Sequence, residues 1–325
     1  CYMFEVKALK KHFKKVRAVD GISFSFQKGD VMGFIGPNGA GKTTAMRVMC
    51  SLDMPTAGEC TVDGKSIFEH PEYLFRKVGF MPDFTGTYPN MDVHEYVDFF
   101  ARAAGLRGKE RDRRVEKIED FTGLDDIRDK QVEDLSKGMK QRLGLGRLLI
   151  HDPDYLILDE PAAGLDPRAR IEVRELLRLL AQTSKGILVS SHILTELAEI
   201  CNTVAIIDRG NILSTGSVDE IKRMLKSEIE IDLIFCKECD TEQLEKFLLT
   251  RPEAENSRIS ARTASFIFTG EEKDIPSFLH LLFDRGFPIL EIKNRELSME
   301  DIFMQVTDGS GSGNEEKKED DRSHL

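Results

Sequence analysis

A glycine-rich stretch near the N-terminus constrains the fold of this chain more than any other feature. Residues 36–43 read GPNGAGKT and have the spacing G-x-x-x-x-G-K-[S/T]. Residues 31–35 are an apolar run typical of a buried strand, whereas residues 43–50 lack Gly and Pro and favour a helix. The order strand, glycine loop, helix predicts a phosphate-binding loop of the Walker A type within an α/β fold.

The residue types in this loop suit a nucleoside triphosphate with Mg²⁺. Glycines allow successive backbone N–H groups to face one concave side, and the start of a helix adds free N–H groups and a positive dipole end. Lys42 is expected to reach the β- and γ-phosphates, and the Thr43 hydroxyl is expected to bind Mg²⁺. The predicted nucleotide-binding residues are Gly36, Pro37, Asn38, Gly39, Ala40, Gly41, Lys42, Thr43 and Thr44.

Composition limits the classes of protein to which the chain can belong. Its 325 residues suffice for about two domains, and 40% hydrophobic with 32% charged residues is ordinary for a globular protein. The formal net charge of −11 argues against a general nucleic-acid binder. No stretch approaches the roughly 20 apolar residues of a membrane helix, and no signal peptide is expected.

The six cysteines do not predict a metal site. They are scattered along the chain, mostly among apolar neighbours, and are expected to be reduced cytosolic thiols. Residues 236–239 form a lone C-x-x-C without the second ligand pair that a zinc site usually needs.

Three patterns follow one another in the first two thirds of the chain. Residues 2–81 are rich in short β-type runs, and residues 91–150 carry apolar side chains at helical spacing. Residues 155–207 then alternate strand and helix, which predicts an α/β unit with a largely parallel sheet. The expected strands are 22–26, 31–35, 59–62, 78–81, 155–158, 186–190 and 203–207, and the expected helices of the last part are 168–182 and 193–200.

A second domain is expected after about residue 227. Its predicted order is βαββαβ, the order of a ferredoxin-like α+β fold. The predicted elements are strand 229–236, helix 241–250, strands 257–261 and 264–269, helix 273–285 and strand 288–293. A short helix near 298–306 and a disordered tail from residue 308, rich in Gly, Ser and then mixed charge, are expected to follow.

Residues 156–160 read LILDE and form an apolar strand that ends in two carboxylates. This pattern matches a Walker B strand followed by a catalytic glutamate. Asp159 is expected to hold Mg²⁺ through its water shell, and Glu160 to orient or deprotonate the attacking water. Acidic pairs at strand ends are common, so the assignment depends on the phosphate loop upstream.

Residues 135–142 read LSKGMKQR and precede a helical run that reaches residue 150. Ser136 is expected to cap this helix, and a capped helix start can bind an anion. Here the chain resembles the nucleotide-binding subunit of an ATP-binding cassette (ABC) transporter, whose signature is L-S-G-G-Q. Leu135, Ser136 and Gly138 match that signature, whereas Lys137 and Met139 depart from it.

The resemblance covers about residues 2–227 and implies further roles. Phe13 stands where the family stacks an aromatic ring on adenine, and residues 164–166 match the D-loop. Asp83 stands at the Q-loop position, where the family has Gln or sometimes Glu, so it is a shorter candidate metal ligand near the contact with a membrane subunit. His192 matches the switch histidine that senses the γ-phosphate. Lys137 adds a cation near the phosphate site and is expected to tighten ATP-driven closure modestly.

The family implies a P-loop NTPase cassette with a mixed sheet core and a helical subdomain at about 87–150. With the patterns above, the expected domains are 1–227, 228–307 and a tail 308–325. Two subunits would pack head to tail, so that Ser136 and Gly138 of one chain meet the ATP bound by the other. Lys42, Glu160 and His192 are the expected catalytic residues. ATP hydrolysis would drive export through a separate membrane permease from the cytoplasmic face of the membrane.

Two other functions stay open at this point. A soluble ABC ATPase acting on nucleic acid or ribosomes usually carries two cassettes, whereas this chain has one and is acidic. A non-hydrolysing regulator is disfavoured because Lys42, Asp159, Glu160 and His192 are all present. An extra C-terminal domain that ends in residues 298–303, SMEDIF, resembles the exporter-like branch, and its expected role is to stabilise a dimer.

Overall fold

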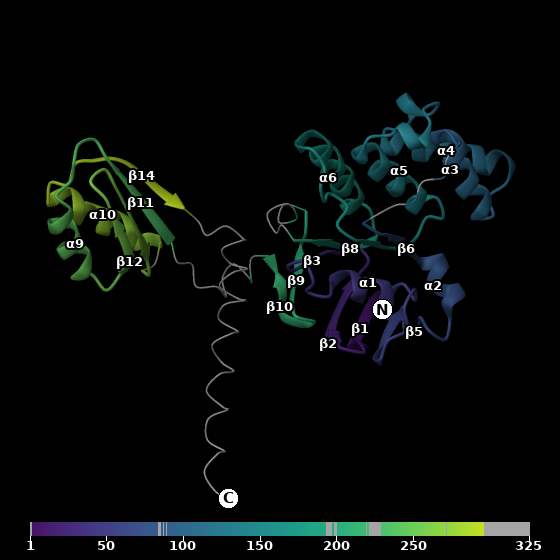
Figure 1. Cartoon of the computed structure of the whole chain (residues 1–325), viewed down its shortest axis with the longest axis horizontal. Helices are drawn as coiled ribbons and strands as arrows, with labels where there is room; N and C mark the ends of the chain where they lie inside the picture. Colours follow the sequence, from purple (N-terminus) through teal and green to yellow (C-terminus); the bar gives the residue numbers. More distant parts are fainter. Residues whose placement is uncertain are drawn as a thin grey trace, which may run out of the picture. The chain divides into compact units, whose positions relative to one another are not determined.

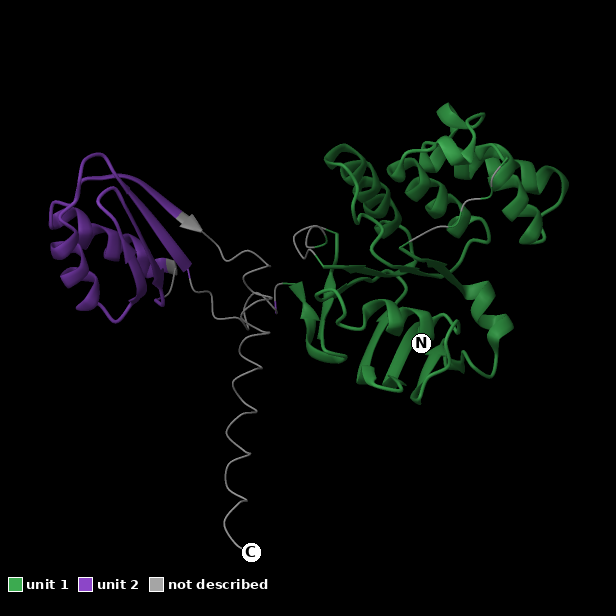
Figure 2. Cartoon of the chain, viewed as in Figure 1, with its two compact units in different colours: residues 1–218 green, residues 219–325 purple. Residues whose placement is uncertain are grey.

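A computed structural model of the chain describes residues 2–83, 86, 88, 90–192, 197, 200–218, 220, 229–270 and 272–295. The chain divides into two compact units, residues 1–218 and 219–325, which Figure 2 colours green and purple. The sequence pattern changes near residue 227, whereas the structural division falls after residue 218. The expected helices at 193–200 and 298–306 and the expected tail lie largely or wholly outside the described residues.

An antiparallel sheet of four strands in the order β2-β1-β4-β5 forms one layer of the first unit. Its strands are β1 (Met3–Phe13), β2 (Val16–Gln27), β4 (Ala57–Val62) and β5 (Lys65–Ser66). On β2, Ile22, Phe24 and Phe26 are buried and alternate with exposed residues, because successive side chains of a strand face opposite sides. The sheet therefore turns one apolar face to the core.

The second layer is a six-stranded sheet in the order β10-β9-β3-β8-β7-β6. Its strands are β3 (Val31–Ile35), β6 (Val78–Met81), β7 (Tyr155–Leu158), β8 (Gly186–Ser191), β9 (Thr203–Asp208) and β10 (Asn211–Ser217). All neighbours pair in parallel except β10, which is antiparallel to β9. Strands β3 and β7 are continuous apolar runs, and β8 is a buried run that ends in two serines, because both faces of the sheet are covered.

Helices complete the first unit. Apolar residues of α1 (Lys42–Met49) share one core with residues of both sheets, and α2 (Pro71–Lys77) precedes β6. A group made of α3 (Val93–Ala103), α4 (Gly108–Thr122) and α5 (Lys137–Leu149) confirms the expected helical insert. Two short 3₁₀ turns, η1 (Asp125–Ile127) and η2 (Val132–Asp134), connect α4 to α5. Helix α6 (Pro167–Ala181) packs against α5.

The second unit has the expected βαββαβ order. Its elements are β11 (Ile229–Phe235), α9 (Thr241–Leu249), β12 (Ala254–Ile259), β13 (Thr263–Phe268), the 3₁₀ turn η3 (Glu272–Asp274), α10 (Ile275–Asp284) and β14 (Ile289–Arg295). The strands pair antiparallel in the order β12-β13-β11-β14, and apolar residues of α9 and α10 pack on one face of the sheet. This topology is ferredoxin-like, as predicted.

No helix in the described part of the chain is both long and apolar enough to cross a membrane.

Candidate functional site

The glycine loop joins the end of β3 to the start of α1. Residues 36–41 form the loop, and Lys42, Thr43 and Thr44 open the helix. A Cβ atom on Gly36 would lie 2.2 Å from the carbonyl oxygen of Ile207. Gly41 has φ +107°, and a Cβ there would lie 2.2 Å from the carbonyl oxygen of Ala18. The backbone path therefore needs glycine at both positions, as the motif predicts.

Lys42 turns back into this loop. Its side chain is 5% exposed, and its Nζ atom donates to the carbonyl oxygens of Gly36 (2.7 Å) and Pro37 (3.2 Å). The same Nζ lies 3.1 Å from Oε1 of Glu160, which directly follows the Walker B aspartate. The two motifs therefore meet at the ammonium of Lys42, with the loop carbonyls holding it in place.

Asp159 is a buried carboxylate at the end of β7, 1% exposed. Its Oδ1 accepts a hydrogen bond from Ser190 Oγ (2.8 Å), whereas Oδ2 has no hydrogen-bond partner among the described residues. Burial raises the pKa of Asp159, hydrogen bonding by Ser190 and Thr43 lowers it, and the charges of Glu160 and Asp83 raise it.

The surroundings of Asp159 are compatible with a bound Mg²⁺ ion. The described residues contain no cluster of three or more His, Cys, Asp or Glu side chains placed to hold one. Mg²⁺ does not need such a cluster, because it is usually bound by one or two carboxylates together with substrate phosphates and water. The unpartnered Oδ2 of Asp159, with the Thr43 hydroxyl in hydrogen-bonding contact with the same carboxylate, fits a hard cation of this kind.

Glu160 lies between two nitrogen groups. Its Oε2 is 2.9 Å from Nδ1 of His192, and its Oε1 faces Lys42. The side chain of Glu160 is 15% exposed, and its backbone is in the left-handed region, with φ +46°. Its backbone N–H donates to Ser190 Oγ (2.9 Å). A carboxylate oriented in this way can take up a proton from a nearby water.

The signature segment, residues 135–142, lies at the start of α5, away from Glu160 and Lys42. Ser136 caps α5 and accepts a hydrogen bond from the backbone N–H of Met139 (3.3 Å). A Cβ atom on Gly138 would lie 2.5 Å from Cβ of Ala169 on α6, so this glycine lets the two helices approach. The ammonium of Lys137 lies over the D-loop: a Cβ on Gly164 would be 2.6 Å from Lys137 Nζ.

The residues of the expected site therefore fall into two groups that lie apart within one chain. Lys42, Asp159, Glu160 and His192 come together at the ends of β3, β7 and β8. Helix α5 packs with α3, α4, α6 and β6, whereas α1 packs on β1 and β2. Figure 1 draws α1 and α5 on opposite sides of the six-stranded sheet.

Comparisons with known proteins agree with this architecture. The sequence profile of the family described as "ABC transporter" matches residues 19–163. A "Nod factor export ATP-binding protein I" from Burkholderia thailandensis is 34% identical over 93% of this chain and 96% of its own length. The protein of the same name from Ralstonia nicotianae is 33% identical over 94% of both chains.

Solved structures give the same result. A structure titled "Structure of ATP binding subunit of ABC transporter" aligns with a TM-score of 0.62 and 28% identity, over 68% of this chain and 92% of that one. CbiO1 from Clostridium perfringens, described as part of the ABC transporter complex cbiONQ, aligns with a TM-score of 0.61 and 26% identity, over 69% and 94%. This chain belongs to the ATP-binding subunits of ABC transporters. Such subunits are ATPases that drive transport.

Two further residues of this ABC subunit were expected in the site. Phe13 ends β1 and is 52% exposed as a residue, and the ammonium of Lys11 lies 5.1 Å from its ring centre. Asp83 is exposed, its backbone carbonyl accepts from Gln141 Nε2 (3.4 Å), and its charge raises the pKa of Asp159. Phe13 is thus a half-exposed aromatic residue at the end of β1, and Asp83 lies within electrostatic reach of the Asp159 carboxylate.

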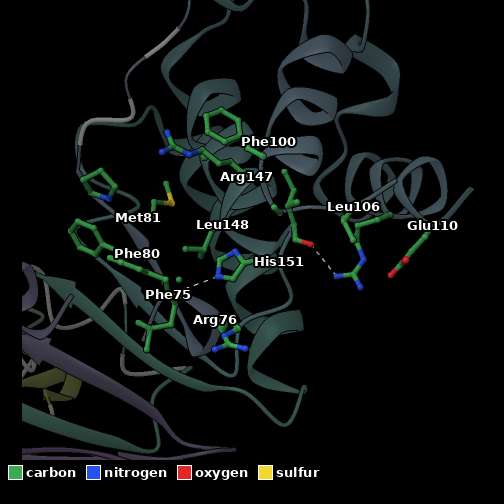
Figure 3. A pocket seen from close by; sticks show the side chains of 18 residues that line it. Phe75, Arg76, Phe80, Met81, Phe100, Leu106, Glu110, Arg147, Leu148 and His151 are labelled. Carbon is green, nitrogen blue, oxygen red and sulfur yellow. Dashed lines mark hydrogen bonds between the residues drawn. The ribbon is translucent and has the colours of Figure 1, made fainter. Parts of the chain in front are cut away.

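Sequence motifs did not indicate two features of the site. The first is Ser190, whose hydroxyl bridges Asp159 and Glu160. The second is a groove of about 650 Å³ between the β6 edge of the sheet and helices α3, α4 and α5 (Figure 3). Met81 and Pro82, directly before Asp83, line this groove, as does His151, whose Nε2 donates to the carbonyl of Val78 (3.4 Å).

Aromatic and charged side chains face the same groove. The Arg147 guanidinium lies 4.2 Å from the ring centre of Phe100, and both side chains are drawn at the groove in Figure 3. Phe75, on the opposite wall, is 61% exposed. Burial lowers the pKa of His151, which favours its neutral form. The groove is thus an open surface of mixed aromatic and cationic character directly before Asp83 in the chain.

Proposed function

We propose that this subunit powers export through a separate membrane protein by ATP-driven closure of a head-to-tail dimer. The observation that carries the proposal is the separation described above. Lys42, Asp159, Glu160 and His192 assemble within one chain, whereas Ser136 caps a helix on the other side of the sheet. A second chain in reversed orientation would supply the missing helix start, as the family resemblance implies.

In this proposal the glycine loop and Lys42 bind the triphosphate, and the exposed ring of Phe13 stacks on adenine. Thr43 and Asp159 would hold Mg²⁺, with Asp83 as a nearby acidic group. When bound, the ion supplies positive charge that offsets the charge developing on the phosphate oxygens. These residues bind and orient the substrate.

Glu160 is the proposed base. Its carboxylate would take the proton of the water that attacks the γ-phosphorus, and His192 would orient that carboxylate through the 2.9 Å contact. The capped start of α5 in the second chain, with Ser136 and Gly138, would stabilise the transferring phosphoryl group from the other side. Binding of ATP would then close the dimer, and hydrolysis would allow it to open.

The groove beside the Q-loop is the proposed docking surface for the membrane subunit. It adjoins Met81 and Pro82, so movement of the segment leading to Asp83 would reach it directly. The names of the relatives support export as the direction of transport. The proposed location is the cytoplasmic face of the membrane.

Substitution of Arg147 tests the proposed docking of the membrane subunit at this groove. Arg147→Ala removes the cation on Phe100 and is expected to weaken co-purification with the membrane subunit that the proposal requires by about tenfold. Arg178→Ala, at an exposed position on α6, is the matched control and should have no effect. Equal co-purification of both variants would contradict docking at this groove.

The hydrolysis part is tested by Glu160→Gln. Loss of the base should lower ATP turnover by about 10²–10⁴-fold and leave an ATP-bound dimer detectable by size-exclusion chromatography. Glu172→Gln removes an exposed carboxylate on α6 and should keep normal turnover, because its contact with Arg168 is a surface ion pair. Normal turnover in Glu160→Gln would remove Glu160 from its proposed role.

A further inference from the structure

Ser190 lies near the end of β8 and is 1% exposed. Strands β7 and β8 run parallel with Leu158 opposite Val189, so the chain continues with Asp159 beside Ser190. The Ser190 hydroxyl donates to Oδ1 of Asp159 (2.8 Å) and accepts from the backbone N–H of Glu160 (2.9 Å). One buried hydroxyl therefore contacts both consecutive acidic residues.

Glu160 needs this support because of its backbone. Its φ of +46° lies in the left-handed region, which is unfavourable for a residue with a side chain and persists only where the surroundings hold it. The N–H of Glu160 is held by Ser190, and the preceding N–H, that of Asp159, donates to the carbonyl of Met81 on β6 (2.8 Å). The turn that aims Glu160 at Lys42 is thus held from the two neighbouring strands.

Asp159 depends on the same hydroxyl. Its carboxylate is buried, and within the described chain Oδ2 has no hydrogen-bond partner. The bond from Ser190 to Oδ1, together with the Thr43 hydroxyl, fixes the rotation of the group. Without the Ser190 bond only the Thr43 hydroxyl would restrain rotation about the Cβ–Cγ bond, and the direction of Oδ2 would be set less firmly.

We propose that Ser190 is a positioning residue for ATP hydrolysis: its hydroxyl sets the direction of the Asp159 carboxylate and the path of the Glu160 backbone together. This inference rests on the proposed function of Asp159 and Glu160. Ser190 touches neither nucleotide nor water in this account and acts through its two neighbours. Removing such a supporting hydrogen bond typically lowers metal affinity or activity by about 10–100-fold.

The sharpest test compares Ser190→Thr with Ser190→Val. The two side chains have nearly equal size and both suit a strand, but threonine alone keeps the hydroxyl. Ser190→Val is expected to lower kcat for ATP by about 10–100-fold and to raise the Mg²⁺ concentration for half-maximal activity, with KM for ATP changed less than about threefold. Ser190→Thr should recover most of the loss.

A readout that does not depend on turnover is available in the Glu160→Gln background. There, Ser190→Val should raise the Mg²⁺ concentration needed for ATP-dependent dimer formation, measured by analytical ultracentrifugation, whereas Ser190→Thr should not. The matched control is Thr203→Val in the same sheet. It removes a buried hydroxyl that has no hydrogen-bond partner among the described residues, and it should leave both measurements unchanged.

Each outcome decides the proposal. Equal kcat and equal Mg²⁺ dependence for Ser190→Thr and Ser190→Val would overturn it. Failure of Ser190→Val to fold, with Ser190→Thr folded, would assign the hydroxyl to stability and would also overturn it. Normal turnover in Glu160→Gln would instead contradict the proposed function itself, so the two failures can be told apart.

Discussion

The nucleotide-binding end of the sheet and the start of α5 hold their functional groups in opposite ways. At the first, Lys42 and Asp159 are buried, and Glu160 is held from both sides by partners of the same chain. At the second, Ser136 and Lys137 are exposed, and the hydrogen bond of Ser136 closes only its own helix turn. In the proposed dimer, the residues for hydrolysis are thus held in place by their own chain, whereas the signature is exposed for contact with the second chain.

The largest expected effect is at the buried end. Lys42→Ala removes the cation that both loop carbonyls and Glu160 surround, and hydrolysis should fall by at least about 10³-fold together with ATP binding. Binding is measured by isothermal titration calorimetry and turnover by phosphate release. Lys246→Ala, an exposed lysine of α9, is the control. If Lys42→Ala kept its ATP affinity, the claim that the buried end forms the ATP-binding site would be contradicted.

A negative charge at the start of α5 should lower ATP turnover without weakening ATP binding to the single chain. Ser136→Asp keeps a good N-cap but places a carboxylate where a partner's γ-phosphate is expected, whereas Ser136→Asn keeps the cap without the charge. We expect Ser136→Asp to lower turnover by about 10²-fold while ATP binding to the single chain stays normal. If Asn and Asp lower turnover equally, the electrostatic part of this prediction is wrong.

Substitutions at the nucleotide-binding end of the sheet and at the start of α5 should change the free energy of unfolding in opposite directions. Burial raises the pKa of Asp159 above its usual value of 3.8, so the folded chain holds this proton more tightly than the unfolded chain. The penalty for ionised Asp159 is absent below pH 3.8 and fully present once the pH exceeds the folded pKa.

Asp159→Asn should therefore raise the free energy of unfolding at pH 7 by about 1 kcal/mol, and the gain should shrink as the pH falls toward 3.8. Ser136→Ala, which removes the cap of α5, should lower it by about 1 kcal/mol. Urea unfolding at several pH values checks both. A pH-independent gain in Asp159→Asn would contradict the account of the buried charge.

The smallest expected effect concerns Lys137. Its ammonium lies over Gly164 of the same chain, next to the proposed phosphate-facing helix start. In the Glu160→Gln background, Lys137→Gly should raise the ATP concentration for half-maximal dimer formation by about threefold, and Lys137→Arg should keep it near the parent value. Unchanged dimer formation in Lys137→Gly would show that the departure from the signature has no role in closure.

The sequence predicted the parts of this molecule that depend on neighbours along the chain. The loop at 36–43, the carboxylates after β7 and the βαββαβ order were all readable from local patterns. Strand β12 begins at Ala254 rather than at the expected residue 257. Its second and third residues, Glu255 and Asn256, are polar, and a register irregularity falls between Glu255 and Arg258. Alternation of apolar and polar residues is weak in such a strand.

Ser190 and the groove escaped prediction for a different reason. Ser190 matters because the parallel register of β7 and β8 places it beside Asp159, 31 residues away in the sequence. The groove joins Phe75 and Met81 to Phe100, Arg147 and His151, which meet only after the helical insert packs against the sheet edge. Both arrangements join residues that are far apart in the sequence, so no contiguous motif marks them.

Mixing two inactive variants tests the central claim most directly. In a head-to-tail dimer of one Lys42→Ala chain and one Ser136→Asp chain, one composite site carries both changes and the other carries neither. ATP turnover of the equimolar mixture should rise well above that of either variant alone, to roughly a quarter of the wild-type rate if dimers form at random. A mixture no more active than its two components would contradict the shared site.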